Sequence, residues 1–155
     1  MIKYSFICKT KQWPPRLKKI NILIKRIMQF KKDLYFKKNV DYDCNLILTN
    51  DKFIKKINFQ FRKVNEPTDI LTFISDIHIN KKENKKVCDI FLSADTICKD
   101  SIINEINFYD HLSHLIIHSF LHINGFVHEK FKDFIQMQTV EIKVLKKLGI
   151  SNPYI

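Results

Sequence analysis

Apolar and polar residues alternate at the start of the chain, which predicts a β-strand at residues 2–8. The Trp13-Pro14-Pro15 segment then breaks the extended pattern, because proline fixes its backbone and donates no amide hydrogen bond. From Arg16 to about Lys32, apolar residues recur at helical intervals and predict an amphipathic helix. Its apolar positions are Leu17, Ile20, Ile24, Ile27 and Met28.

The other side of this helix is basic. It carries Lys18, Lys19, Lys25 and Arg26. The simpler interpretation is a core helix whose charged side is solvated. The alternative is that the same side chains also bind phosphate groups, which clustered lysines and arginines attract. The pattern leaves both interpretations open.

Short apolar runs predict three further strands, since each has strand length and is bounded by polar residues. The strands expected here are residues 45–49, 70–74 and 87–92. The polar segment 75–86 is predicted to be an irregular, mobile loop.

Helices are expected after two of these strands. Asn50 or Asp51 can cap a helix that runs to about Phe61, because either side chain can accept a bond from a first-turn amide. Pro67 is expected to stop this helix, and Ser93 to cap the next one.

The last third of the chain contains two more helical patterns. Asn107 to Asp110 resembles a capping box that opens the first of them. The second is amphipathic from about Phe131 to Leu148, and Gly149 is expected to end it.

The order of the elements predicts an α+β fold with about five helices packed on a mixed sheet of about four strands. At 155 residues and 45% hydrophobic content, one core and a single domain over residues 1–155 are expected. No run of residues approaches the length of a membrane span. Four separated cysteines favour free thiols in a reducing compartment, so the chain is expected to be cytoplasmic and to have no membrane partner.

The net charge of +11, from 27 basic and 16 acidic residues, favours a polyanionic partner, with nucleic acid the first candidate. A compositional alternative stays open. Lysine, asparagine and isoleucine are abundant and glycine is scarce, as an AT-biased genome would produce without any binding role.

The most specific pattern is H-x-x-x-H-x-x-G-x-x-H, formed by His118, His122, Gly125 and His128. Residues four apart share one face of a helix, so the first two imidazoles can point at a common centre. Gly125 can adopt the left-handed conformation that ends a helix, and the returning chain then delivers His128. Three histidines leave one position of tetrahedral Zn²⁺ open to water, so the pattern predicts a catalytic metal site on a central helix. The alternative is a core helix that happens to carry histidines.

Two classes of zinc hydrolase fit this spacing. Metallopeptidases place a glutamate general base after the first histidine, but Ser119 and Phe120 follow His118 here, which disfavours proteolysis. Phosphodiester cleavage also needs positive charge at the phosphate. Arg62, expected in a polar loop, could supply a bidentate guanidinium, or it could be an ordinary surface residue. The three nitrogens suit Ni²⁺, Cu²⁺ or Co²⁺ as well as Zn²⁺.

Three segments of the chain match motifs of a known family. They are His118 to His128, Arg62 with Pro67-Thr68-Asp69-Ile70-Leu71-Thr72-Phe73, and Asp89-Ile90-Phe91-Leu92. Together they resemble the bacterial YbeY family of metal-dependent endoribonucleases, which are rRNA maturation factors. The family patterns are H-G-x-L-H-L-x-G-Y-D-H and R-G-x-D-x-P-T-D-V-L-S-F. The resemblance extends from about Leu46 to Gly149.

The resemblance implies that His118, His122 and His128 bind one zinc ion per chain. It implies that Arg62 contacts the RNA backbone. Arg62 and His114 are accordingly predicted as the catalytic residues beside the metal, with His114 in a lesser role, toward the RNA, behind the ligands or in packing. The implied substrate is single-stranded RNA rather than DNA. The implied roles are 16S rRNA 3′-end processing and ribosome quality control, with the small ribosomal subunit and its associated proteins as partners.

The chain departs from the family pattern at Ser119, at Phe126-Val127 and at Lys63-Val64. Val127 removes a carboxylate that could have supported an imidazole, so weaker metal retention is one consequence to test. None of the departures removes a ligand. The alternative function is a ribosome-associated RNA-binding factor with a structural metal and little catalysis. A metallopeptidase is the third hypothesis.

Overall fold

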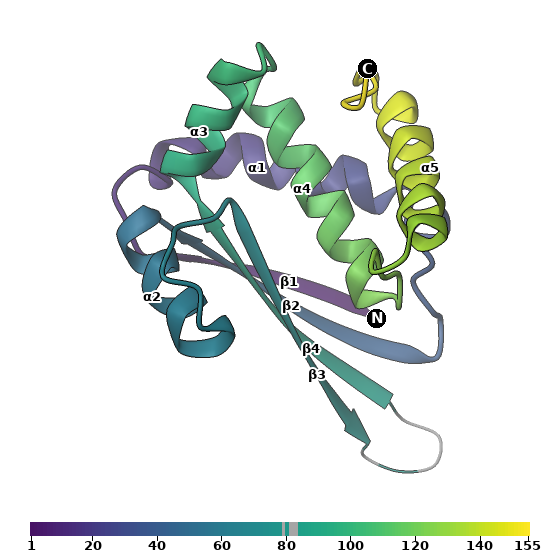
Figure 1. Cartoon of the computed structure of the whole chain (residues 1–155). Coiled ribbons are helices and arrows are strands. Elements are labelled where there is room, and N and C mark those ends of the chain that lie inside the picture. The colour runs from purple at the N-terminus through teal and green to yellow at the C-terminus, as the bar shows by residue number, and fades with distance from the viewer. Residues whose placement is uncertain (79, 81–83) are drawn as a thin grey trace. The chain divides into compact units, whose positions relative to one another are not determined.

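The computed structural model of the chain describes residues 1–78, 80 and 84–155. These residues form one four-stranded mixed sheet and five α-helices, which confirms the predicted α+β class (Figure 1). They group into two compact units, Met1–Leu17 with Lys38–Phe108 and Lys18–Lys37 with Tyr109–Ile155. The single domain over residues 1–155 stays a prediction. None of the described helices is long and apolar enough to cross a lipid bilayer.

The sheet belongs to the first unit, and its strands are ordered β1-β2-β4-β3 (Figure 1). β1, β2 and β4 run parallel to one another, whereas β3 is antiparallel to β4. The strand bounds are β1 Ile2–Cys8, β2 Val40–Thr49, β3 Ile70–His78 and β4 Asn84–Ser93.

The two central strands, β2 and β4, carry buried apolar side chains in register. The paired residues are Cys44 with Cys88, Leu46 with Ile90, and Leu48 with Leu92. Alternation sends the intervening side chains to the other face, where Asn45 donates to Asp89 at 2.9 Å and accepts from Ser5 at 2.9 Å. One face of these strands is therefore apolar, and a line of polar contacts crosses the other.

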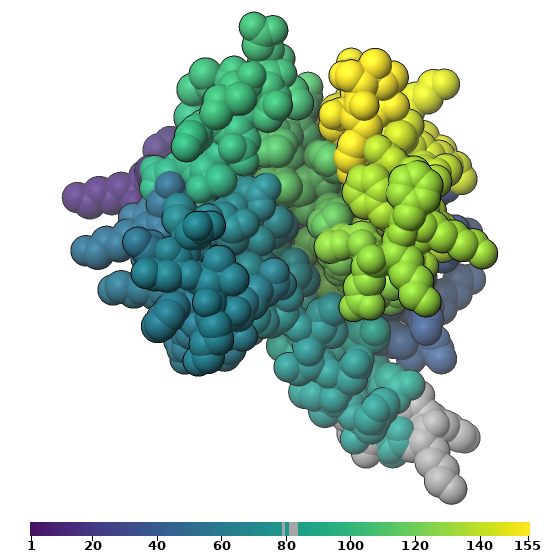
Figure 2. All heavy atoms as spheres, in the orientation of Figure 1, coloured from purple at the N-terminus to yellow at the C-terminus, as the bar shows by residue number. Residues whose placement is uncertain are grey.

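Three strands are longer than the sequence pattern predicts. β2 begins at Val40 rather than at residue 45, β3 continues to His78, and β4 begins at Asn84. The irregular loop predicted at 75–86 is therefore wrong for 75–78 and 84–86. Residues 79 and 81–83 lie outside the described residues. This end of β3 is exposed, so its side chains show no buried alternation, and the teal end of the strand pair reaches the surface in Figure 2.

α2 (Asp51–Arg62) begins as predicted, because the Asn50 side chain accepts a hydrogen bond from the Phe53 amide at 2.9 Å. Its end differs. The helix stops at Lys63, which adopts the left-handed conformation with φ 60°, four residues before Pro67. The prediction that Pro67 stops the helix is wrong, and so is the placement of Arg62 in a polar loop.

α3 (Ala94–Ile103) has Ser93 as its N-cap residue, as predicted, but the Ser93 side chain makes no capping hydrogen bond. The Ser93 hydroxyl instead donates to Asp51 Oδ1 at 2.6 Å. The Thr96 hydroxyl donates to the same oxygen at 2.5 Å. Asp51, in the first turn of α2, thus joins the starts of the two helices.

The second unit contains nearly all of α1 (Leu17–Met28) and α4 (Phe108–Ile123), and the whole of α5 (Phe131–Lys147). Figure 1 shows α4 and α5 next to each other. Of the predicted apolar stripe of α1, Ile20, Ile24 and Ile27 are buried, and the residues at its two ends are half-buried. The helix ends at Met28 rather than near Lys32. Within this unit the Asn124 amide donates to the Leu34 carbonyl at 2.9 Å, which joins the end of α4 to the segment after α1.

Candidate metal centre

α4 places two of the predicted ligands one turn apart. Its sequence buries nine side chains, so the helix is held in place by packing along most of its length. His118 and His122, four residues apart, lie on one face with their ring centroids 4.5 Å apart. The His118 side chain is 28% exposed, so this face of the helix is accessible to solvent.

A tight turn after α4 brings in the third histidine. Gly125 has φ +95°, a conformation that residues with a Cβ adopt only at a cost. The turn is closed by bonds from the Gly125 amide to the His122 carbonyl at 3.1 Å and from the Phe126 amide to the Leu121 carbonyl at 3.0 Å. The exposed His128 ring then lies with its centroid 4.8 Å from that of His122.

The structure thus brings together His118, His122 and His128. Each offers one ring nitrogen, and the three nitrogens lie within 4.8 Å of one another. The centroid distance from His118 to His128 is 5.5 Å, so no member of the trio faces away from the others. This convergence agrees with the spacing argument from the sequence.

Hydrogen bonds orient two of the rings. His118 Nδ1 lies 2.6 Å from Glu141 Oε1, and His122 Nδ1 lies 2.9 Å from the Phe126 carbonyl oxygen. Both partners only accept, so each Nδ1 carries the proton and donates it. The Nε2 atoms are then left with lone pairs, which are the form that binds a metal.

The two Nε2 atoms lie 3.0 Å apart. Two lone pairs at this separation repel unless a proton or a metal cation lies between them. Tetrahedral Zn²⁺, with Zn–N bonds near 2.0–2.1 Å, keeps its nitrogens about 3.3 Å apart. The donor set therefore fits a zinc ion, and the same nitrogens also fit other late transition metals.

Glu141, on α5, is the main site residue that sequence reasoning missed. Its side chain is only 1% exposed and accepts from His118, from His114 Nε2 at 2.7 Å and from the Tyr154 hydroxyl. Burial would raise the pKa of Glu141, but these hydrogen bonds outweigh it and lower the pKa to about 2. Glu141 is therefore a carboxylate behind the His118 ring.

One sequence signal for Glu141 was available. It occupies the buried face of α5 together with apolar residues, which are Met137, Val144 and Leu145. An acidic residue within an apolar helical stripe needs a buried partner, because an unpaired buried charge is costly. The pattern does not say which residue that partner is.

His122 is held in its neutral form. Burial lowers its pKa from 6.5 to about 4, and the neighbouring His118 adds to the effect. A neutral imidazole is the ligand form, so the surroundings of His122 favour metal binding at neutral pH. The pKa of Tyr154 is raised by burial and by its bond to Glu141.

The two residues predicted as catalytic lie in different surroundings. His114 contacts Glu141, and its Nε2 lies 3.2 Å from the Tyr154 hydroxyl, so it sits behind His118 on α4. Arg62 is the exposed last residue of α2 in the first unit. Their catalytic roles stay predictions. Ser119, at the position of the peptidase glutamate, is fully buried.

Comparison with known proteins gives a consistent picture. A family model described as Endoribonuclease YbeY matches residues 6–149. A protein named Endoribonuclease YbeY from Ehrlichia ruminantium (strain Gardel) is 36% identical over 148 residues, covering 94% of this chain and 90% of that protein. One of the same name from Anaplasma marginale (strain Florida) is 30% identical over 148 residues, covering 94% and 93%.

The fold also matches a solved structure. The solution structure of TM1509 from Thermotoga maritima aligns with a TM-score of 0.55 and 23% identity, covering 96% of this chain and 92% of that one. At this level of identity the match supports the fold alone.

Proposed function

Because the chain belongs to the YbeY family of endoribonucleases, we propose that it is a zinc-dependent enzyme that cleaves single-stranded RNA. Its proposed role is rRNA maturation at the 16S 3′ end and ribosome quality control, in the cytoplasm and with the small subunit and its associated proteins. In this proposal His118, His122 and His128 hold one zinc ion per chain.

The observation that carries the proposal is the convergence of three imidazoles, two of which are oriented by hydrogen bonds at their Nδ1 atoms. Glu141 and the Phe126 carbonyl each hold an Nδ1 proton, so the Nε2 lone pairs of His118 and His122 face a common centre. The third ring, His128, is exposed, which leaves a path for a large substrate.

In this proposal some side chains orient the metal ligands, and others bind the RNA. Zinc, when bound, supplies a Lewis acid and lowers the pKa of water for attack on a phosphodiester. Glu141 keeps the His118 ring in its ligand orientation, and His114 and Tyr154 hold the Glu141 carboxylate. We assign Arg62 to a phosphate of the RNA, since its guanidinium can form two parallel hydrogen bonds with phosphate oxygens.

The test compares single histidine substitutions. His118→Ala, His122→Ala and His128→Ala should each lose bound metal and the cleavage of a labelled single-stranded RNA. His78→Ala is the matched control, because His78 is an exposed histidine of β3 in the first unit. It should keep both properties.

The outcomes separate the candidate functions. A variant that lacks metal but cuts RNA at the wild-type rate would contradict the proposal. Wild-type protein that binds RNA and metal but never cleaves would instead favour the RNA-binding factor with a structural metal.

A further inference from the structure

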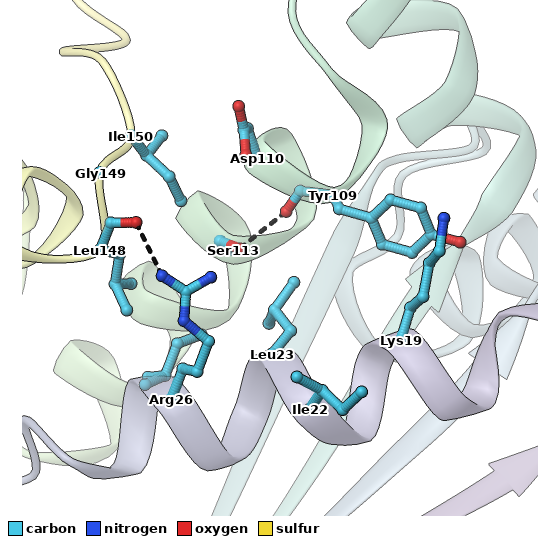
Figure 3. A pocket seen from close by; sticks show the side chains of 11 residues that line it. Lys19, Ile22, Leu23, Arg26, Tyr109, Asp110, Ser113, Leu148, Gly149 and Ile150 are labelled. Atoms are coloured by element: carbon cyan, nitrogen blue, oxygen red, sulfur yellow. Dashed lines mark hydrogen bonds between the residues drawn. The ribbon is translucent and has the colours of Figure 1, made fainter.

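A pocket of about 430 Å³ lies in the second unit, and its lining includes none of the three histidines (Figure 3). α1 supplies one wall, with Lys19, Ile22, Leu23 and Arg26. The opposite wall comes from the start of α4 and from the residues after α5, including Ile150. This volume is in the range of small-molecule sites, which run from about 300 to 1,000 Å³.

Two cations flank the pocket, and neither is paired with a carboxylate among the described residues. Arg26 donates one hydrogen bond to the Leu148 carbonyl at 3.0 Å (Figure 3). A guanidinium has five N–H donors, so most remain for a ligand, and the bond to Leu148 fixes its position. The Lys19 ammonium lies 5.1 Å from the centroid of the Tyr109 ring.

The space between the cations is apolar. Ile22 is 52% exposed there, although a large aliphatic side chain is more often covered. Leu23 and Ile150 add to the same lining. Asp110 also lines the pocket and would repel a simple inorganic anion, but a carboxylate can accept from the exocyclic amino group of a nucleobase. The lining therefore suits a ligand with a flat base and attached phosphates.

The geometry of α1 separates its basic side chains into two pairs. Lys19 and Arg26 are seven residues apart, so they lie on nearly the same side of the helix. Lys18 and Lys25 form a second pair with the same spacing, displaced by about 100° around the axis. Only the first pair lines the pocket.

We propose that this pocket binds one nucleotide of a single-stranded RNA, with its base against Ile22 and Leu23 and the adjoining phosphates at Lys19 and Arg26. The identity of the ligand rests on the proposed function, since an endoribonuclease needs contacts with its substrate beyond the reacting bond.

The test measures RNA binding in the presence of a chelator, so that cleavage plays no part. The probe is a fluorescent oligocytidylate, and its anisotropy gives the dissociation constant at several salt concentrations. In the double variant Lys19→Ala/Arg26→Ala the dissociation constant should rise about tenfold. The slope of log K against log salt should fall by about 1.4, because each phosphate contact to a single strand contributes about 0.7.

Lys18→Ala/Lys25→Ala is the matched control. It removes the same charge from the same helix and should change the dissociation constant less than about twofold and leave the slope unchanged. Arg26→Lys is a second control. It keeps a positive charge beside the Leu148 carbonyl, so the fold should be preserved and most of the affinity for RNA should remain. Cytidine monophosphate should displace the probe at a lower concentration than inorganic phosphate.

Equal losses in the two double variants would overturn the proposal, because they would indicate a diffuse basic surface. Displacement by inorganic phosphate or by an acidic peptide as readily as by the nucleotide would also overturn it. Because the assay involves no cleavage, an inactive enzyme would count against the proposed function alone. An active enzyme with unaltered binding in Lys19→Ala/Arg26→Ala would count against the pocket alone.

Discussion

Glu141 receives hydrogen bonds from three side chains, and one of them is a proposed metal ligand. Val127 stands where the family pattern has an aspartate beside the third ligand. A carboxylate does support a proposed ligand, but it is Glu141 of α5 and it contacts His118. The orientation of His118 therefore depends on a contact between α4 and α5, whereas the orientation of His122 depends on Phe126 within the ligand motif.

Glu141→Gln should weaken metal binding about tenfold to a hundredfold, because a neutral amide holds the His118 Nδ1 proton less strongly than a carboxylate. Competition with a chelating indicator measures the affinity. Tyr154→Phe is the control, since it removes one bond to Glu141 but keeps the one to His118. If Glu141→Gln binds metal as tightly as the wild type, Glu141 does not position the ligand.

Acid should destabilise the metal-free protein through His122. Its pKa is near 4 in the folded chain and 6.5 ordinarily, so between these values the unfolded state binds a proton that the folded state does not. The free energy of unfolding should therefore fall as the pH drops through this window, by less than the roughly 3 kcal/mol of the full shift, because solvent partly screens the half-buried ring.

Urea unfolding with a chelator present measures this loss at each pH. His122→Asn removes the titrating group and should abolish most of the change between pH 6.5 and 4. If the free energy of unfolding of the variant falls with pH as steeply as that of the wild type, other groups cause the acid sensitivity. Below pH 4.5 the lowered pKa of Glu141 should add a second loss in the same direction.

Arg62→Ala should lower kcat/KM for RNA cleavage about tenfold to a hundredfold, the effect expected from losing a charge-assisted bond to phosphate. Arg62→Lys should recover part of it, because lysine keeps the charge but not the bidentate fork. Lys56→Ala, an exposed cation of the same helix, is the control. Equal rates in Arg62→Ala and the wild type would make Arg62 an ordinary surface residue.

The sequence predicts the histidines of the site but not their support. His118, His122 and His128 lie within eleven residues, so helical spacing and one glycine turn suffice to bring them together. Glu141 and Tyr154 reach the site through helix packing, 23 and 36 residues after His118. No local sequence pattern encodes such a contact. The acidic residue among the buried apolar residues of α5 does indicate that Glu141 has a buried partner.

At the scale of elements, β2 and β3 are longer than the sequence analysis predicts, for two different physical reasons. In β2, apolar and acidic residues alternate from Val40 to Cys44, and this segment pairs with β4. The alternation is itself a strand signal, so the sequence does indicate the longer strand. The end of β3 is exposed, and backbone pairing with β4 sustains it without any buried pattern. Helix ends were less predictable than helix positions, since Lys63 rather than Pro67 ends α2.

The turn after α4 should depend on glycine. Gly125→Ala has space for its Cβ but must hold a positive φ, so it should lose about 1–2 kcal/mol of stability and bind metal more weakly as His128 shifts. Gly149→Ala is a matched control, because Gly149 has φ +78° at the end of α5 and equally open surroundings. It should lose similar stability, measured by thermal unfolding.

Metal affinity distinguishes the two glycines. Only Gly125→Ala should show a weaker metal affinity. Weaker binding in both variants would mean that general loosening of the unit, and not the path to His128, controls the site.

At the scale of the whole molecule, a basic chain carries a compact cluster of three imidazoles. The charge of +11 leaves the choice between nucleic-acid binding and compositional drift open, and the family relationship favours the first. In the proposed function the cluster supplies the chemistry, and the basic side chains supply attraction for a polyanion. Neither alone would account for an endoribonuclease.

The most direct test titrates metal-stripped protein with Zn²⁺ while the cleavage of a single-stranded RNA is recorded. We predict that cleavage is absent without metal and rises linearly until one zinc ion is bound per chain, the number that three converging histidines hold. Full cleavage by the stripped protein, or a rate that does not respond to the first equivalent of metal, would contradict the account.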